Sequence, residues 1–138
     1  MRKALCIAAL VLAGCQRQTG AMPWRENSTL ATEDDCGLTN YPASKSPYEI
    51  VADAPHDAGA ADGSVTAKVV IDADGRVKYM RVTHLAYPDA KNANELNAQA
   101  VESIRDWPYS LTMIEGRPVP ICSDVGVEVP RPQTIARR

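Results

Sequence analysis

The sequence predicts an α+β fold, a small β-β-α-β domain over residues 64–130 with a three-stranded antiparallel sheet and one helix packed on one face. Three observations predict it. Apolar residues alternate along residues 64–71, before an Asp-Gly pair and a second β-prone stretch, they recur at helical spacing over residues 92–107, and they alternate again over residues 119–129. A period of two is typical of a half-buried strand, and a period near 3.6 is typical of an amphipathic helix.

The first two strands are predicted to form a hairpin. One face of the strand 64–71 is apolar, through Val65, Ala67, Val69 and Ile71. Asp74-Gly75 suits a type I′ turn because glycine accepts positive φ. On the return strand 76–84 the apolar residues fall on both parities, Val77 and Tyr79 on one, Met80 and Val82 on the other. A β-bulge would reconcile the two parities, so we expect one in this strand.

The helix is predicted over residues 92–107, with Asn92 as its N-cap and Pro108 ending it. One face carries an apolar stripe, Ala93, Leu96, Ala100, Ile104 and Trp107. Packing of this stripe on the sheet explains it without a cofactor.

The last strand is predicted to run for up to eleven residues, from Val119 to Val129. Its apolar parity holds Val119, Ile121, Val125, Val127 and Val129. Pro118 and Pro120 cannot donate to a sheet, so we expect the beginning of this strand at a sheet edge.

The first fifteen residues resemble the leader of a bacterial lipoprotein. Arg2 and Lys3 precede an apolar run of ten residues, which is too short to span a bilayer but fits a signal peptide. Residues 12–15, Leu-Ala-Gly-Cys, look like a lipobox. The resemblance implies a signal peptide over residues 1–14, lipidation of Cys15 and a location in the cell envelope facing the periplasm, and Gln16 favours the outer membrane. The alternative is an ordinary secretory leader.

Two cysteines remain after this processing, because Cys6 leaves with the leader and Cys15 is lipidated. In an oxidising compartment Cys36 and Cys122 are predicted to form a disulfide. Closing so long a loop is worth roughly 4–5 kcal/mol in the chain-entropy model. Metal binding by the two cysteines and a histidine is the alternative, but no ligand spacing supports it and no metal is expected.

Outside the domain, residues 15–63 are predicted to hold the lipidated cysteine and a partly ordered segment, with residues 16–35 as a tether. Residues 131–138 are a basic tail. The net charge is −2 for the whole chain and near −4 once Arg2 and Lys3 are removed, which excludes a basic nucleic-acid-binding surface.

The order of these elements resembles the C-terminal domain of TonB-type energy transducers, over residues 64–129. The matching motifs are the hairpin 63–82, the Trp107-Pro108-Tyr109 helix end, the Gly116-Arg117-Pro118-Val119 turn and Asn40-Tyr41-Pro42. A transducer of that family has an N-terminal transmembrane helix and a long Pro-rich spacer. This chain has a lipoprotein leader and a short tether instead, so the usual route of force transduction is in doubt.

The resemblance implies binding of an outer-membrane transporter or another envelope protein by β-strand addition, in transmembrane transport. The pairing stretch would be Ser123, Asp124, Val125, Gly126 and Val127. Alternatively, residues 36–60 cover this edge and the chain is a structural or inhibitory lipoprotein without a transport role. Exposed sheet edges can also pair between two copies of a chain, so a homodimer is a further possibility.

No catalytic constellation is found around His56 or His84, and neither an enzyme nor a cofactor is expected.

Overall fold

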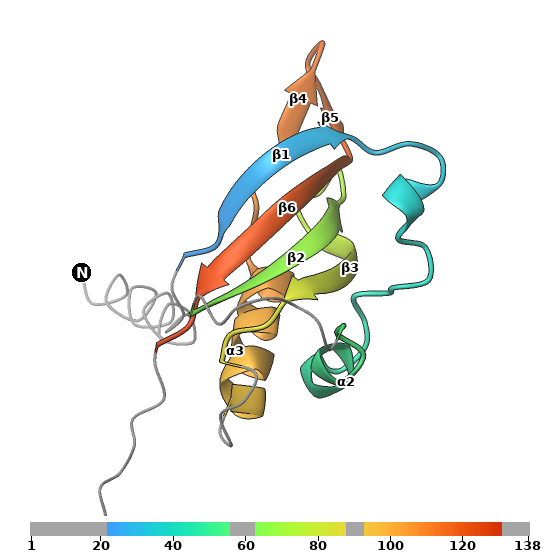
Figure 1. Cartoon of the computed structure of the whole chain (residues 1–138). Helices are drawn as coiled ribbons and strands as arrows, with labels where there is room; N and C mark the ends of the chain where they lie inside the picture. The colour runs from blue at the N-terminus through green and yellow to red at the C-terminus, as the bar shows by residue number, and fades with distance from the viewer. Residues whose placement is uncertain (1–21, 56–62, 88–92, 131–138) are drawn as a thin grey trace, which may run out of the picture.

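A computed structural model of the protein describes residues 22–55, 63–87 and 93–130. The lipobox with Cys15, the predicted cap Asn92 and the basic tail 131–138 lie outside the described residues. The fold is a small α+β domain with an antiparallel sheet and one long helix, as the sequence predicts (Figure 1). In the part of the chain that the structure describes, no helix is long and apolar enough to cross a membrane.

The main sheet has four strands rather than the three that the sequence predicts. They are β1 (Trp24–Leu30), β2 (Ser64–Ile71), β3 (Val77–His84) and β6 (Ile121–Glu128). Their order is β1-β6-β2-β3, and every neighbouring pair is antiparallel. The predicted tether therefore contains a strand, and β6 is an inner strand with a neighbour on each side.

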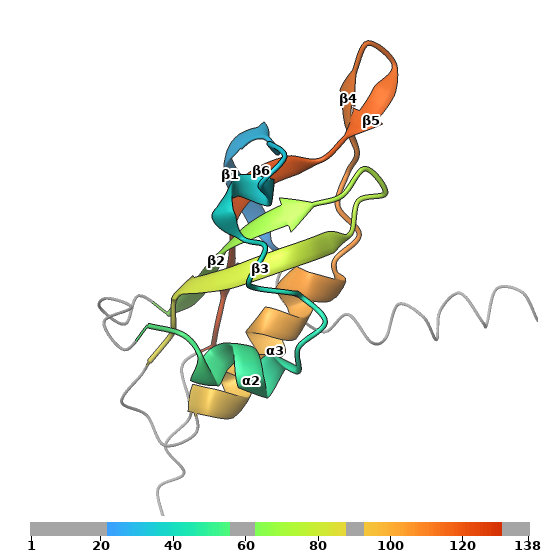
Figure 2. The ribbon, with the colours of Figure 1, turned by 90° about the vertical axis from the view of Figure 1, so that its right-hand side faces the viewer.

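The predicted eleven-residue strand is divided at Pro120. Its first residue, Val119, is the last residue of β5 (Arg117–Val119), which pairs with β4 (Thr112–Ile114) in a separate hairpin that projects beyond the main sheet (Figures 1 and 2). Glu115 and Gly116 form the two-residue turn, both at positive φ, as a type I′ turn requires. Only the part after Pro120 joins the main sheet, because Pro118 and Pro120 lack the N–H that a paired strand needs.

The hairpin of β2 and β3 has the expected bulge. Val70 pairs with Tyr79 and Ile71 pairs with Val77, so Lys78 is the extra residue. The bulge lets Val77 join Met80 and Val82 in the main core. The turn is not type I′, since it spans residues 72–76 and only Gly75 has positive φ. An added Cβ on Gly75 would lie 2.5 Å from the backbone oxygen of Tyr109, so glycine also permits this close approach.

One face of the sheet is covered by α3 (Ala93–Asp106), with the short helix α2 (Pro47–Ala52) packed beside it (Figure 2). The predicted stripe of α3 meets the apolar side chains of β2, β3 and β6. Helix α2 begins at Pro47, where Ser46 and Glu49 form a capping box. The buried side chain of Asn97 bonds to both the N–H and the carbonyl of Ala86, which fixes the segment after β3 to α3.

Candidate functional site: the outer edge of strand β6

The five residues predicted to pair with a partner alternate between the two faces of the sheet. Ser123, Val125 and Val127 are buried on the helix side, while Asp124 and Gly126 lie on the opposite face. On the inner side, β2 pairs with β6 along its whole length, from Ile71 opposite Ile121 to Ser64 opposite Glu128. Only the outer edge of β6 is therefore available for any further strand.

The outer edge of β6 is occupied by β1 of the same chain. Trp24 lies opposite Gly126, Glu26 opposite Asp124, and Leu30 opposite Ile121. An open edge is thus wrong for this conformation, and β1 covers it rather than residues 36–55, the described part of the segment expected there as the alternative. Residues 41–43 pair with the other edge of the sheet instead, where the Met80 N–H donates to the carbonyl of Tyr41 and the Ala43 N–H to that of Lys78.

A bulge interrupts the pairing of β1 with β6. Between Glu26 and Thr29 the register shifts, and Asn27 takes a φ of 50°, which asparagine tolerates better than most residues. The Ser123 hydroxyl, on a side chain only 1% exposed, donates to the carbonyl of Glu26 and bonds to the hydroxyl of Ser28. On the opposite face the Asn27 amide donates to the Asp124 carboxylate at 3.2 Å.

At the beginning of β1, the indole of Trp24 lies against the backbone of Gly126. A Cβ added to Gly126 would overlap the ring, with Cε2 only 2.5 Å away. An aromatic side chain over a glycine of a neighbouring strand fills the space that the missing side chain leaves. Gly126 is therefore the residue that allows Trp24 to sit on this edge.

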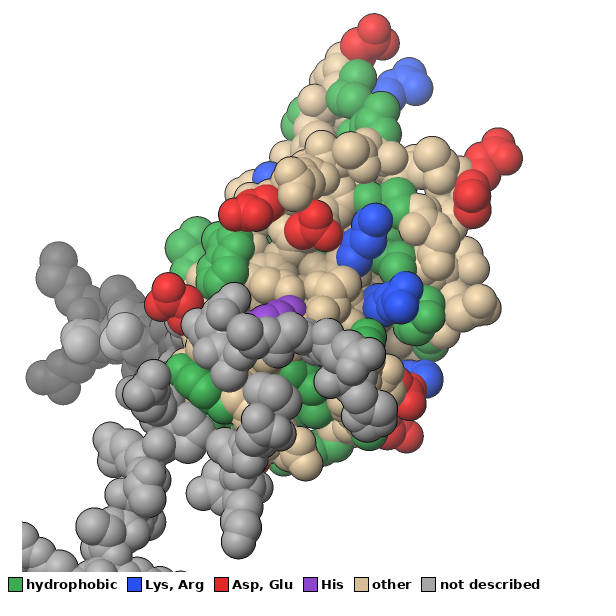
Figure 3. All heavy atoms as spheres, in the orientation of Figure 1, with side chains coloured by type: hydrophobic (Ala, Val, Ile, Leu, Met, Phe, Trp, Pro, Cys, Tyr) green, Lys and Arg blue, Asp and Glu red, His purple; other side chains and the backbone are tan. Residues whose placement is uncertain are grey.

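Apart from these contacts, β1 is weakly attached to the domain. All seven of its residues are exposed, whereas six of the eight residues of β6 are buried. The face of the sheet that α3 leaves uncovered is largely polar, with Lys, Arg, Asp and Glu side chains spread over it (Figure 3). Since β1 buries no side chain in the main core, main-chain pairing supplies most of its attachment.

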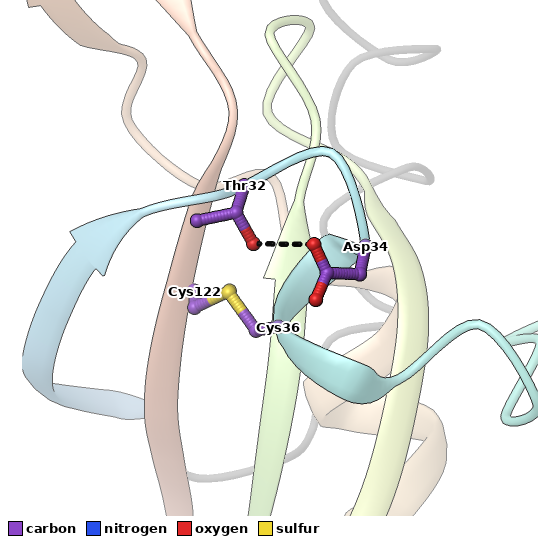
Figure 4. Close-up of a disulfide and its surroundings, with 4 residues drawn as sticks. All are labelled: Thr32, Asp34, Cys36 and Cys122. Atoms are coloured by element: carbon purple, nitrogen blue, oxygen red, sulfur yellow. Dashed lines mark hydrogen bonds between the residues drawn. A yellow bond between two sulfur atoms is a disulfide. The ribbon is translucent and has the colours of Figure 1, made fainter.

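The predicted disulfide between Cys36 and Cys122 is present (Figure 4). It joins the short helix η1 (Asp35–Gly37) to β6, and the two Cα atoms are 6.4 Å apart. Cys122 lies opposite Thr29 of β1, so the covalent link lies beside the end of the covering strand. Around it, Leu38 and Val70 form a small second core on the face away from α3.

No metal site accompanies this edge within the described residues. No three His, Cys, Asp or Glu side chains in residues 22–55, 63–87 and 93–130 are grouped to hold a metal. His84 lies at the end of β3, and His56 is outside the described residues. Burial raises the pKa of the Tyr109 phenol, and the Arg25 guanidinium of β1 offsets this in part. The hydroxyl of Tyr109 donates to the carbonyl of Ile104, which is a structural role.

A sheet edge that accepts an added strand defines a class of protein-interaction domain. The family model described as Gram-negative bacterial TonB protein C-terminal matches residues 57–128, more than half of the chain, and the chain belongs to this family. Neither a curated protein nor a solved structure matches the chain in the corresponding comparisons. The family match includes β6 but neither β1 nor Cys36, so the covering strand and one half of the disulfide lie outside it.

Domains of this family are protein-interaction domains of the Gram-negative cell envelope rather than enzymes, and they act with envelope or outer-membrane proteins. The chain is therefore a TonB-like interaction module connected with transport. The order of the motifs in the sequence predicts this family. The sequence does not predict the strand at residues 24–30, because WRENSTL has neither a run of β-branched residues nor an alternating apolar face.

Proposed function

We propose that this protein is a lipid-anchored module that faces the periplasm and binds an extended segment of an outer-membrane transporter, or of another envelope protein, at the outer edge of β6. The partner segment would replace β1 and pair with residues 122–126 of β6. The single observation that carries this proposal is the way in which β1 is held. It is a strand with no side chain in the main core, attached mainly through its main chain, which is the contact that strand addition makes.

Replacement of β1 is physically feasible because the strand contributes little to the core. Sheet segments with few buried apolar contacts open locally at lower free energy than the whole domain unfolds. When β1 opens, β6 keeps its pairing with β2 and its buried side chains, so the edge remains in the geometry that a partner needs. The proposed anchor at Cys15 would hold the module near the membrane where such partners lie.

The test is photocrosslinking in cells, with the probe on side chains that the fold does not bury. Ser123, Val125 and Val127 face the core, so a probe there would disturb packing. Asp124 and Glu128 lie on the opposite face of β6 and suit the purpose. Glu102, on the exposed side of α3, is the matched control position.

Crosslinks from positions 124 and 128 to a periplasmic segment of another envelope protein, absent from position 102, are the expected result. Crosslinks to residues 24–30 of the same chain alone would contradict the proposal. A second copy of the chain as the sole partner would indicate exchange of β1 in a homodimer instead. Lipidation is tested separately: labelled fatty acid should enter the wild-type protein and not Cys15→Ser.

A second function has one specific observation in its favour. The covering strand lies beside the disulfide, since Thr29 pairs with Cys122, and such a link opposes release of β1. A permanently covered edge would suit a structural or inhibitory lipoprotein with no transport role. Amide exchange distinguishes the two, because a permanently covered edge requires the β1 N–H groups that bond to β6 to exchange as slowly as those of β2.

A further inference from the structure

We infer that the outer edge of β6 selects extended segments that carry an aromatic side chain opposite Gly126, and that β1 is a built-in competitor of the same chemical class. This inference rests on the proposed strand addition at β6 and specifies which segments would be bound. In the absence of a partner, β1 of the same chain occupies the edge of β6, and Trp24 takes the position of the partner's aromatic residue.

The steric argument concerns Gly126. It has an ordinary strand conformation with no positive φ, so backbone strain does not require glycine there. What requires glycine is the space, because three atoms of the Trp24 ring lie within 3 Å of the place where a Cβ would be. The side chain of a valine or alanine at this position would occupy the space that the Trp24 ring takes. Because residue 126 is glycine, this part of the edge can bind a flat apolar group.

A second determinant lies four residues further along the added strand. The buried hydroxyl of Ser123 bonds to the Glu26 carbonyl and the Ser28 hydroxyl, so it recognises the bulge that begins after Glu26. A partner segment without a bulge or a small hydroxyl residue here would leave the buried Ser123 hydroxyl less well bonded, which is unfavourable. The preferred segment therefore has an aromatic residue first and Ser or Thr at the fifth position, as in Trp24 to Ser28.

The competition between β1 and a partner strongly favours β1, because a short covalent connection holds β1 close to β6. Leu30 is followed six residues later by Cys36, which is bonded to β6 itself. A short connection of this kind keeps the local concentration of β1 high, on the order of millimolar. A partner segment must therefore exceed β1 in affinity or arrive while β1 is open. The aromatic contact at Gly126 is the place where it can do so, because there the ring of Trp24 lies directly against the backbone of β6.

The experiment uses the mature chain with β1 disabled and a labelled peptide of residues 22–32, MPWRENSTLAT, as the probe. The open variant is Trp24→Ala with Arg25→Pro and Glu26→Pro. Of two adjacent strand residues, one directs its N–H toward β6, so the two prolines remove that donor whichever residue supplies it. Circular dichroism and thermal unfolding verify that the rest of the domain is folded. Fluorescence anisotropy measures binding of the probe and of the same peptide with alanine in place of tryptophan.

We expect the tryptophan peptide to bind the open variant roughly tenfold more tightly than the alanine peptide, because the alanine peptide loses the contact of a partly covered aromatic ring with Gly126. Adding Gly126→Ala to the open variant should abolish that difference. Equal binding of the two peptides, or a difference that survives Gly126→Ala, would overturn the selectivity and leave strand addition intact. Failure of both peptides to bind a folded open variant would overturn strand addition itself, and the selectivity with it.

Discussion

The indole of Trp24 rests on Gly126, at the point where the first strand of the sheet meets the last. The two residues are about a hundred positions apart in the sequence, and the contact joins the exposed edge strand to the buried centre of the sheet. Because the glycine has no side chain, the Trp24 ring can lie against the backbone of residue 126. Any larger residue at this position would displace the ring. This contact therefore adds a side-chain contribution to the main-chain pairing that holds β1 on β6.

Replacing Gly126 with alanine should release β1 without unfolding the domain. The added methyl group overlaps the Trp24 ring, and such overpacking typically costs about 1–3 kcal/mol. We expect the amide hydrogens of residues 24–30 that bond to β6 to exchange faster, by roughly fivefold to a hundredfold, while those of β2 and β3 exchange as before. Hydrogen–deuterium exchange with mass spectrometry measures both in one experiment.

The control for this prediction is the Trp24→Ala background. Once the ring is absent, Gly126→Ala has nothing to overlap, so its effect on β1 exchange should vanish. Two contacting residues should give such non-additive effects, whereas independent residues give additive ones. Additive effects of Trp24→Ala and Gly126→Ala would show that the ring does not depend on the glycine.

The sequence predicted the parts of this fold that carry periodic apolar residues. The β2–β3 hairpin, its bulge near Tyr79, and the stripe of α3 were all expected, and so was the disulfide between Cys36 and Cys122. Each depends on a local pattern or on simple counting. The division at Pro120 is not predicted, because the two prolines indicate only a sheet edge at the beginning of one continuous strand, whereas Ile121 already lies in an inner strand.

The fourth strand could not be predicted because its attachment is not encoded in a local pattern. The residues from Trp24 to Leu30 are mostly polar and bury no face in the core, so they give no alternation to recognise. They form a strand because β6 offers unpaired main-chain groups and because the Trp24 ring can pack against the backbone of Gly126. Pairing with a strand that is distant in the sequence overrides the weak β-propensity of residues 24–30. A single sequence shows only this local propensity.

The disulfide should supply a large part of the stability of this small domain. Cys36 and Cys122 are 86 residues apart, and cross-linking so long a loop is worth roughly 4–5 kcal/mol in the chain-entropy model. We expect Cys36→Ser with Cys122→Ser to lower the free energy of urea unfolding by about that amount. A reducing agent should lower the wild type to a similar degree and leave the double variant unchanged. Equal stability of oxidised and reduced wild type would contradict this.

The buried side chain of Asn97 should be sensitive to replacement. Its amide bonds to the Ala86 N–H at 3.1 Å and to the Ala86 carbonyl at 2.9 Å, and all of these groups are buried. Asn97→Leu leaves two buried main-chain groups unpaired, at about 1–3 kcal/mol each. We expect thermal unfolding at a clearly lower temperature. Asn94→Leu, on the exposed side of the same helix, is the control and should change stability by no more than about 0.5 kcal/mol.

Tyr109 should make the domain sensitive to alkaline conditions. Burial raises the pKa of its phenol, and its hydroxyl donates to the Ile104 carbonyl at 2.7 Å, so the folded state keeps the proton. The unfolded chain releases that proton near pH 10. Above this pH the folded state binds more protons than the unfolded state, so stability falls as pH rises, by up to about 1.4 kcal/mol per pH unit. Below pH 10 both states are protonated and this contribution is constant.

Tyr109→Phe isolates that effect, because phenylalanine does not titrate. The variant should be less stable than the wild type by about 1 kcal/mol at pH 7–9, since the hydrogen bond to Ile104 is lost. As the pH rises from 10 to about 11.5 the difference should shrink and then reverse, because only the wild type carries the proton penalty. The raised pKa values of Lys45 and Lys78 also lower stability at high pH, but equally in both proteins. Urea unfolding across this range measures the difference, with the exposed Tyr48→Phe as control. Parallel stability curves for the wild type and Tyr109→Phe above pH 10 would mean that the phenol of Tyr109 ionises as readily in the folded domain as in the unfolded chain.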